Sequence, residues 1–242
     1  MNNLHALLAL IERLQGPQGC AWDQKQTLKS MQPRLLEESY EVFEAIEQEN
    51  PLDLCEELGD LLFVMLSCVG IANAQYGISL EDICDKINKK MIRRHPHLFQ
   101  GTTAPQSWEA QKNRDSLLDG IPTHLPALLI AQKQAQRAST VGFDWPDVAG
   151  VLQKIEEELT ELKEALHSSD LNSIEHEIGD LLMATSNLSR KHNLSAELAL
   201  KKATNRFDRR FRFVEKHAPQ KLENCSLEEL ENLWQRAKMS GN

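Results

Sequence analysis

The chain has 242 residues, of which 41% are apolar and 26% are charged, a balance typical of a folded globular protein and not of a disordered one. Its formal net charge of −9 argues against a general binder of nucleic acid polymers or anionic membranes, although a locally basic segment can still bind phosphate. Aromatic residues, glycine and proline are all scarce, which disfavours an all-β fold and favours helices.

The N-terminal segment, 1–15, spaces its apolar residues as a helix does and lacks the features of a signal peptide. The most apolar run, 58–74, is interrupted by Gly59 and Asp60 and is too short to span a membrane. The five cysteines are odd in number and widely spaced, which predicts reduced thiols and not a disulfide framework or a zinc site. We therefore expect a cytoplasmic protein that does not associate with membranes.

Two acidic motifs lie on the next two predicted helices. The first reads Glu-Glu-x-x-Glu at 37–41, and the second reads Glu-Leu-Gly-Asp at 57–60. In each motif two carboxylates stand three residues apart and therefore share one face of the helix. These four residues are Glu38, Glu41, Glu57 and Asp60. Two such helices packed face to face would gather four carboxylates around one space, where their repulsion is tolerable only with a cation between them.

The same quartet recurs 120 residues further along the chain. Subtraction gives 158 − 38 = 120, 177 − 57 = 120 and 180 − 60 = 120, so the acidic residues repeat without a slip. The second quartet consists of Glu158, Glu161, Glu177 and Asp180. The sequence therefore predicts one magnesium site built twice, with Mn²⁺ as the other cation that suits oxygen ligands.

The repeat extends beyond the acidic motifs, with small changes of offset that indicate different loop lengths. Trp22-Asp23 matches Phe143-Asp144 at an offset of 121, and Arg93-Arg94 matches Arg209-Arg210 at an offset of 116. We predict two homologous all-α domains, 1–115 and 122–242, joined through the Pro- and Gly-containing stretch 101–126. Within them, Asn50-Pro51 marks the start of a helix, and Ser226 with Glu229 forms a capping box that opens the last helix.

A single glutamate-rich motif is most often a solvated helix face, but the glycines before the aspartates argue against that interpretation here. Gly59 and Gly179 each lie inside a predicted helix, where glycine costs roughly 1 kcal/mol relative to alanine, and we expect another backbone or a ligand to approach there. A di-iron bundle is the other metal interpretation. It needs Glu-x-x-His pairs, and no acid of either quartet is followed by a histidine three residues later.

A basic helix follows each acidic pair. Lys90, Arg93 and Arg94 in the first half correspond to Arg206, Arg209 and Arg210 in the second. Residues four apart lie on one helix face, and arginine can hold phosphate oxygens bidentately, although salt bridges to nearby glutamates remain the alternative. Three aromatic residues near the loops are expected to pack there, with base stacking as the second possibility: Trp22, Phe143 and Trp145.

Taken together, these motifs resemble the two-domain MazG nucleoside triphosphate pyrophosphohydrolases. The resemblance rests on the duplicated acidic pairs and basic helices, on Gly-Cys-Ala-Trp-Asp at 19–23, Arg-Arg-His-Pro-His at 93–97 and Val-Gly-Phe-Asp-Trp at 141–145. It implies tandem helical bundles, a homodimer, Mg²⁺ held by the quartets, and hydrolysis of nucleoside or deoxynucleoside triphosphates to the monophosphate and pyrophosphate.

The resemblance also implies roles for particular residues. Arg206 to Arg210 would lie on the phosphates, with Trp234 near the nucleotide, and Lys90 and Arg94 would be the counterparts in the first domain. Glu157, or Glu37 in the first site, is the candidate to orient or deprotonate the attacking water.

Two other functions remain open at this point. A regulatory dimer that binds nucleotides without turnover would contain the same helices, and a nucleotidase for dUTP or a damaged nucleotide would differ only in its base pocket. The sequence leaves open the base preference and whether the first site is active.

Overall fold

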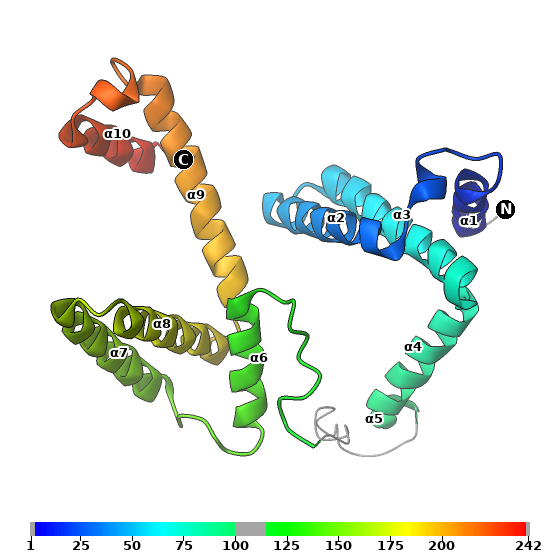
Figure 1. Cartoon of the computed structure of the whole chain (residues 1–242), viewed down its shortest axis with the longest axis horizontal. Helices are drawn as coiled ribbons and strands as arrows, with labels where there is room; N and C mark the ends of the chain where they lie inside the picture. The colour runs from blue at the N-terminus through cyan, green and yellow to red at the C-terminus, as the bar shows by residue number, and fades with distance from the viewer. Residues whose placement is uncertain (1–2, 100–114, 241–242) are drawn as a thin grey trace. The chain divides into compact units, whose positions relative to one another are not determined.

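The computed structural model describes residues 3–99 and 115–240, and these residues form ten α-helices and two 3-10 turns without a β-strand (Figure 1). The all-α prediction is confirmed. The chain divides into two compact units, 1–108 and 109–242. The division falls outside the described residues, as does much of the predicted connection 101–126, so the limits 1–115 and 122–242 stay predictions.

The first unit is built around an antiparallel helical hairpin, α2 and α3. In chain order its elements are α1 (Asn3–Gln15), a 3-10 turn (Asp23–Lys25), α2 (Leu28–Gln48), α3 (Pro51–Tyr76), α4 (Leu80–Arg94) and α5 (Pro96–Phe99). Helix α1 packs against α3, and α4 leaves α3 at a bend of 109° (Figure 1). No single helix in the described part of the chain is long and apolar enough to cross a bilayer, and only the bent pair α3 and α4 passes that test jointly.

The second unit repeats this hairpin as α7 and α8. Its elements are α6 (Ala127–Ser139), α7 (Val148–Ser168), α8 (Leu171–Lys191), α9 (Ala196–His217), a 3-10 turn (Leu222–Asn224) and α10 (Leu227–Met239). Helix α6 packs on α8, and α10 packs on α9 (Figure 1). The order of helices therefore follows the sequence repeat, with α6 in the place of α1 and α9 in the place of α4.

Helix starts agree between the two units residue by residue. Asn50 caps α3 by accepting from Leu52 N, and Asp170, 120 residues later, caps α8 in the same way from Asn172 N. The capping box predicted at Ser226 and Glu229 is present at the start of α10.

The turns between the hairpin helices are also matched. The helix preceding each turn ends on a non-glycine residue in the left-handed region, Glu49 with φ 52° and Ser169 with φ 57°. This conformation is costly for residues that carry a Cβ. Both units therefore use the same strained turn to hold their acidic helices together.

Each unit has a small apolar core. In the first unit it includes Met31, Val42 and Ala45 of α2 and Val64 and Leu66 of α3. In the second unit it includes Val151, Ala165 and Ala184. Several apolar residues of α2 and α7 lie outside this core, because Leu36, Phe43 and Ile46 are exposed, as are Leu159 and Leu166.

A partly buried ion cluster fastens the loop before α7 to the end of α8. Asp144 accepts from Arg190 at 2.6 Å and from Lys191 at 2.9 Å. Burial alone would raise the pKa of Asp144, but these two hydrogen bonds outweigh it, so the pKa lies below the ordinary value. In the first unit the positions that match the two cations, 190 − 120 = 70 and 191 − 120 = 71, hold Gly70 and Ile71.

The aromatic residues of this loop only partly follow the packing prediction. Trp145 lies against Gly150, where an added Cβ would meet the indole ring at 2.6 Å. Phe143, in contrast, is 81% exposed, so the expectation that it packs within the loop is wrong for the chain on its own. Its predecessor Gly142 has φ 84°, and this left-handed residue turns the chain before Asp144 reaches its cations.

Candidate active site

Three carboxylates of the second quartet converge between α7 and α8. Glu158, Glu161 and Glu177 each offer an oxygen, and these oxygens lie within 4.8 Å of one another. Glu158 is only 4% exposed, and its Oε2 is fully buried without a hydrogen-bond partner among the described residues. An ionised carboxylate oxygen in this state is expensive unless a cation satisfies it, so the residues present fit a metal ion.

A lysine already approaches this cluster. Lys154 Nζ lies 2.7 Å from Oε1 of Glu157 and 2.7 Å from Oε1 of Glu158. The hydrogen bonds to Glu157 and Glu158 raise the pKa of Lys154 above its ordinary value. Burial raises the pKa of Glu161, and the nearby carboxylates of Glu158 and Glu177 raise it further, whereas Lys154 lowers it.

The first quartet has the same geometry in the α2–α3 hairpin. Oxygens of Glu38, Glu41 and Glu57 lie within 4.8 Å of one another, and Glu38 is buried. Burial raises the pKa of Glu38, and the carboxylates of Glu41 and Asp60 add to it. Burial also raises the pKa of Glu57, again with help from Glu41 and Asp60. Each group is therefore disfavoured as an anion while no cation is bound.

The predicted aspartates Asp60 and Asp180 lie on the same helices as Glu57 and Glu177. Asp60 is close enough to Glu38 and Glu57 to affect both carboxyl groups, but it does not belong to the converging three. Asp180 is held by His176, with Nε2 and Oδ2 3.3 Å apart. A hollow of about 250 Å³ borders the first cluster and is lined in part by Glu41, Asp53 and Glu57.

No close approach to the two helix glycines occurs within the chain. Among the described residues, and apart from the adjoining backbone of the same helix and the two chain neighbours, no heavy atom lies within 4 Å of a Cβ built on Gly59 or Gly179. The predicted approach of another backbone is therefore wrong within the single chain, and both glycines lie on an open face of their hairpin beside exposed Leu58 and Ile178.

The basic residues lie on α4 and α9. The predicted phosphate contacts of the second unit all lie on α9: Arg206, Arg209 and Arg210. The guanidinium carbon of Arg210 lies 5.9 Å from the centroid of the Trp234 ring on α10. Phe207 lies beside the same ring at 5.2 Å. Arg206 and Arg209 form no ion pair with a described residue, which counts against the salt-bridge alternative for these two. In the first unit, Lys90 and Arg94 lie near the end of α4.

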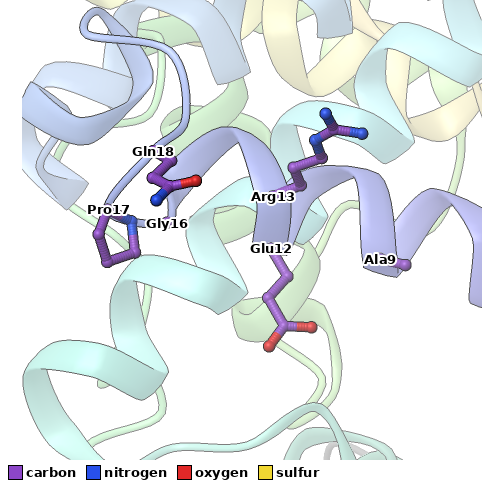
Figure 2. A pocket seen from close by; sticks show the side chains of 6 residues that line it. All are labelled: Ala9, Glu12, Arg13, Gly16, Pro17 and Gln18. Carbon is purple, nitrogen blue, oxygen red and sulfur yellow. The ribbon is translucent and has the colours of Figure 1, made fainter.

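A larger hollow lies away from all of these groups, at the C-terminal end of α1. It is lined by Ala9, Glu12, Arg13, Gly16, Pro17 and Gln18 (Figure 2). Figure 2 shows the Glu12 and Arg13 side chains projecting away from each other and not into one shared site. This hollow contains none of the residues predicted from the sequence.

Two contacts could not be named from the motifs alone, one in the site and one in the loop before α7. Lys154 stands three and four residues before Glu157 and Glu158, a spacing that predicts a contact on a helix, and it could have been found in this way. The pairing of Asp144 with Arg190 and Lys191 spans 46 and 47 residues, and local spacing carries no signal for it.

The fold and the clusters together define a class: duplicated all-α proteins with a carboxylate cluster on each of two helical hairpins. Comparison with known proteins narrows this class. Residues 26–99 and 134–217 each match the MazG nucleotide pyrophosphohydrolase domain. The chain belongs to the MazG family.

Two relatives that match over nearly their whole length support this assignment, and a third matches over half of its own length. The chain is 41% identical to the nucleoside triphosphate pyrophosphohydrolase of Escherichia coli K12, with 98% of both chains covered. It is 42% identical to the nucleoside triphosphate pyrophosphohydrolase/pyrophosphatase MazG of Thermotoga maritima, over 96% of this chain and 94% of the relative. It is 38% identical to the uncharacterized protein YabN of Bacillus subtilis, over 95% of this chain and 50% of that protein.

Proposed function

We propose that the protein hydrolyses nucleoside and deoxynucleoside triphosphates to the monophosphate and pyrophosphate, with Mg²⁺ or Mn²⁺ held by the two quartets. The observation that carries this proposal is the buried, unpartnered Oε2 of Glu158 within a cluster of converging carboxylates. The names of relatives that cover almost the whole chain support the same activity.

The quartets would hold the metal through oxygen atoms alone. Glu158, Glu161, Glu177 and Asp180 would do so in the second unit, and Glu38, Glu41, Glu57 and Asp60 in the first. Mg²⁺ bound there would offset the charge of the phosphates and make the α-phosphorus more electrophilic.

Side chains of the protein carry out the proton transfer and bind the phosphates. Glu157, or Glu37 in the first unit, takes a proton from a water whose oxygen forms a bond to the α-phosphorus. The bond from that phosphorus to the oxygen bridging to the β-phosphorus breaks, and pyrophosphate leaves with the electron pair. Arg206, Arg209 and Arg210 bind the phosphate oxygens, Trp234 lies against the nucleoside, and Lys90 and Arg94 take the arginines' place in the first unit.

A homodimer is part of the same proposal. Three pairs of matched apolar residues lie on the open faces of the two hairpins and are from 37% to 55% exposed in the single chain. They are Ile46 and Leu166, Leu58 and Ile178, and Leu62 and Leu182. The same positions stay apolar in both copies, and Leu58 and Ile178 directly precede Gly59 and Gly179, as expected for faces that a second copy covers.

Product analysis tests the activity. The full-length protein is incubated with Mg²⁺ and a panel of ribo- and deoxyribonucleoside triphosphates, and the products are separated by ion-exchange chromatography. We expect equal amounts of monophosphate and pyrophosphate, and none from a variant with both Glu38→Gln and Glu158→Gln. Release of orthophosphate and a nucleoside diphosphate, or binding without turnover, would contradict the proposal.

A further inference from the structure

The two quartets have the same carboxylates. They differ in the basic residue one helical turn before the buried glutamate. Lys154 precedes Glu158 by four residues, and Arg34 occupies the matching position in the first unit, since 154 − 34 = 120 and 158 − 38 = 120. Both side chains are cations. The structure places them against different partners.

In the second unit the cation lies in the cluster. Lys154 Nζ is 2.7 Å from Glu157 and 2.7 Å from Glu158, and the Glu158 side chain is only 5% exposed. One oxygen of Glu158 is therefore already satisfied by an ammonium group, and the other has no partner among the described residues. A lysine ammonium is a compact point charge on a flexible stem, so it can hold this place and still be displaced.

In the first unit the cation is turned away. The Arg34 guanidinium carbon lies 5.0 Å over the Trp22 ring, a cation–π arrangement, and Arg34 makes no ion pair with a described residue. The carboxylates of Glu38 and Glu41 thus face each other and Asp60 without a positive side chain of their own among the described residues.

Burial distinguishes the Lys154 contact from an ordinary surface pair. Ion pairs of this spacing on an exposed helix are screened by water and contribute little. Here the acceptor Glu158 is excluded from water, so the ammonium interacts with it through a less polar medium, and a second cation at the same oxygens would feel that charge strongly.

We propose that Lys154 is an internal competitor for the divalent cation, so that the substrate-free protein fills its first quartet with metal before its second. This inference rests on the proposed function, in which both quartets hold the metal. A divalent cation at Glu158 must displace the ammonium or bind beside it, whereas at Glu38 it meets carboxylates alone. The two sites thus differ in metal occupancy although their carboxylates are the same.

Manganese is the probe for the test, because free Mn²⁺ is measured directly by electron paramagnetic resonance. The full-length protein is titrated without nucleotide. We expect two classes of site, a tighter one abolished by Glu38→Gln and a weaker one abolished by Glu158→Gln. Lys154→Met should tighten the weaker class by roughly tenfold or more, the factor that corresponds to one lost charge-assisted hydrogen bond.

Matched variants show whether the effect on Mn²⁺ affinity comes from the position of Lys154 or from its positive charge. Arg34→Met removes the corresponding cation of the first unit and should leave both classes unchanged, since Arg34 lies on Trp22. Lys154→Arg keeps a positive charge and should keep Mn²⁺ binding at the second quartet weak. If Lys154→Met does not fold, Lys154→Gln takes its place as the uncharged variant and is compared with Lys154→Arg.

The outcomes distinguish this inference from the proposed function. If the wild-type protein binds no Mn²⁺ at either quartet, the metal assignment itself is wrong. If Mn²⁺ binds both quartets with equal affinity, or the second class does not respond to loss of Lys154, the quartets stand as metal sites and the competitor role of Lys154 is overturned.

Discussion

At the scale of single residues, the structure separates carboxylates that the sequence treats as equivalent. Spacing predicted four acids per site, and three of each four converge, with Glu158 and Glu38 buried at the centre. Helical periodicity fixes which residues share a face. It does not fix how deeply each one lies, because that depends on the packing of the neighbouring helix. It also does not fix which partner a nearby cation takes, since Lys154 and Arg34 hold matching positions and contact different groups.

Removal of a quartet carboxylate is expected to lower turnover by orders of magnitude while the helices stay folded. Glu158→Ala takes away the buried carboxylate and Asp180→Ala takes away the fourth proposed ligand, so the proposed metal ion would be held by fewer oxygens. Turnover is measured with Asp60→Ala also present, so that the first cluster cannot compensate. Glu156→Ala, which removes an adjacent exposed glutamate of α7 from outside the cluster, is the control. Normal turnover in the quartet variants would exclude these acids from catalysis.

Loss of a phosphate-binding arginine should affect kinetics and not stability. If Arg206 and Arg210 bind the triphosphate, alanine at either position lowers kcat/KM by about tenfold to hundredfold, as loss of a charge-assisted contact does. The melting temperature should change little. Arg212→Ala removes an arginine that is occupied by Asp208 at 2.8 Å on the same helix, and its kinetics should stay close to the wild type. Unchanged kcat/KM in the first two variants would place the phosphates elsewhere.

At the scale of elements, the hairpins and their caps follow from the sequence, whereas the loop before α7 does not. Asn50 and the Ser226 box mark helix starts because their side chains bond backbone groups two or three residues away. The Asp144 cluster joins residues 46 and 47 positions apart, and only the folded chain brings them together. Local chemistry is readable from local sequence, and long-range pairing is not.

Asp144→Asn is expected to lower the free energy of unfolding by about 1.5 to 3 kcal/mol, because it leaves two partly buried cations without their counter-charge. Urea unfolding measures this loss. Asp23→Asn is the matched control from the first unit, where Asp23 has no ion pair with a described residue, and it should change stability little.

Asp144 also makes the free energy of unfolding depend on pH. Since the pKa of Asp144 is lowered by folding, its contribution is fully present above the ordinary aspartate pKa of about 4 and is lost as the pH falls below it. The difference in stability between wild type and Asp144→Asn should therefore shrink below about pH 4. A difference that stays constant down to pH 2 would show that the ion cluster is not its origin.

At the scale of the whole molecule, the duplication and the all-α class are readable from the sequence, because an offset of 120 aligns both quartets. The location of the core is harder to predict from the sequence. Apolar periodicity marks faces that are protected from water, but it does not say whether the same chain or a second copy protects them, and Leu58 and Ile178 stay exposed here.

A charged residue on these faces should separate the proposed homodimer. Leu58→Glu combined with Ile178→Glu places a carboxylate on both hairpins, and light scattering after size exclusion should then report a monomer. Leu52→Glu changes an equally apolar and more exposed residue of α3 whose match in the second unit is Asn172, and it should leave the dimer intact. A wild-type monomer, or a double variant that remains dimeric, would contradict the assignment of these faces.

The left-handed residues Glu49 and Ser169 preserve a trace of the protein's history. Neither is glycine, and each departs from the common backbone regions at the same place in its hairpin, at 169 − 49 = 120. Two independent origins of the same unfavourable turn are less economical than one inheritance. An ancestral hairpin with this turn, present before the gene doubled, accounts for both. Divergence since then has changed the cation four residues before Glu38 and Glu158 while leaving the turn alone.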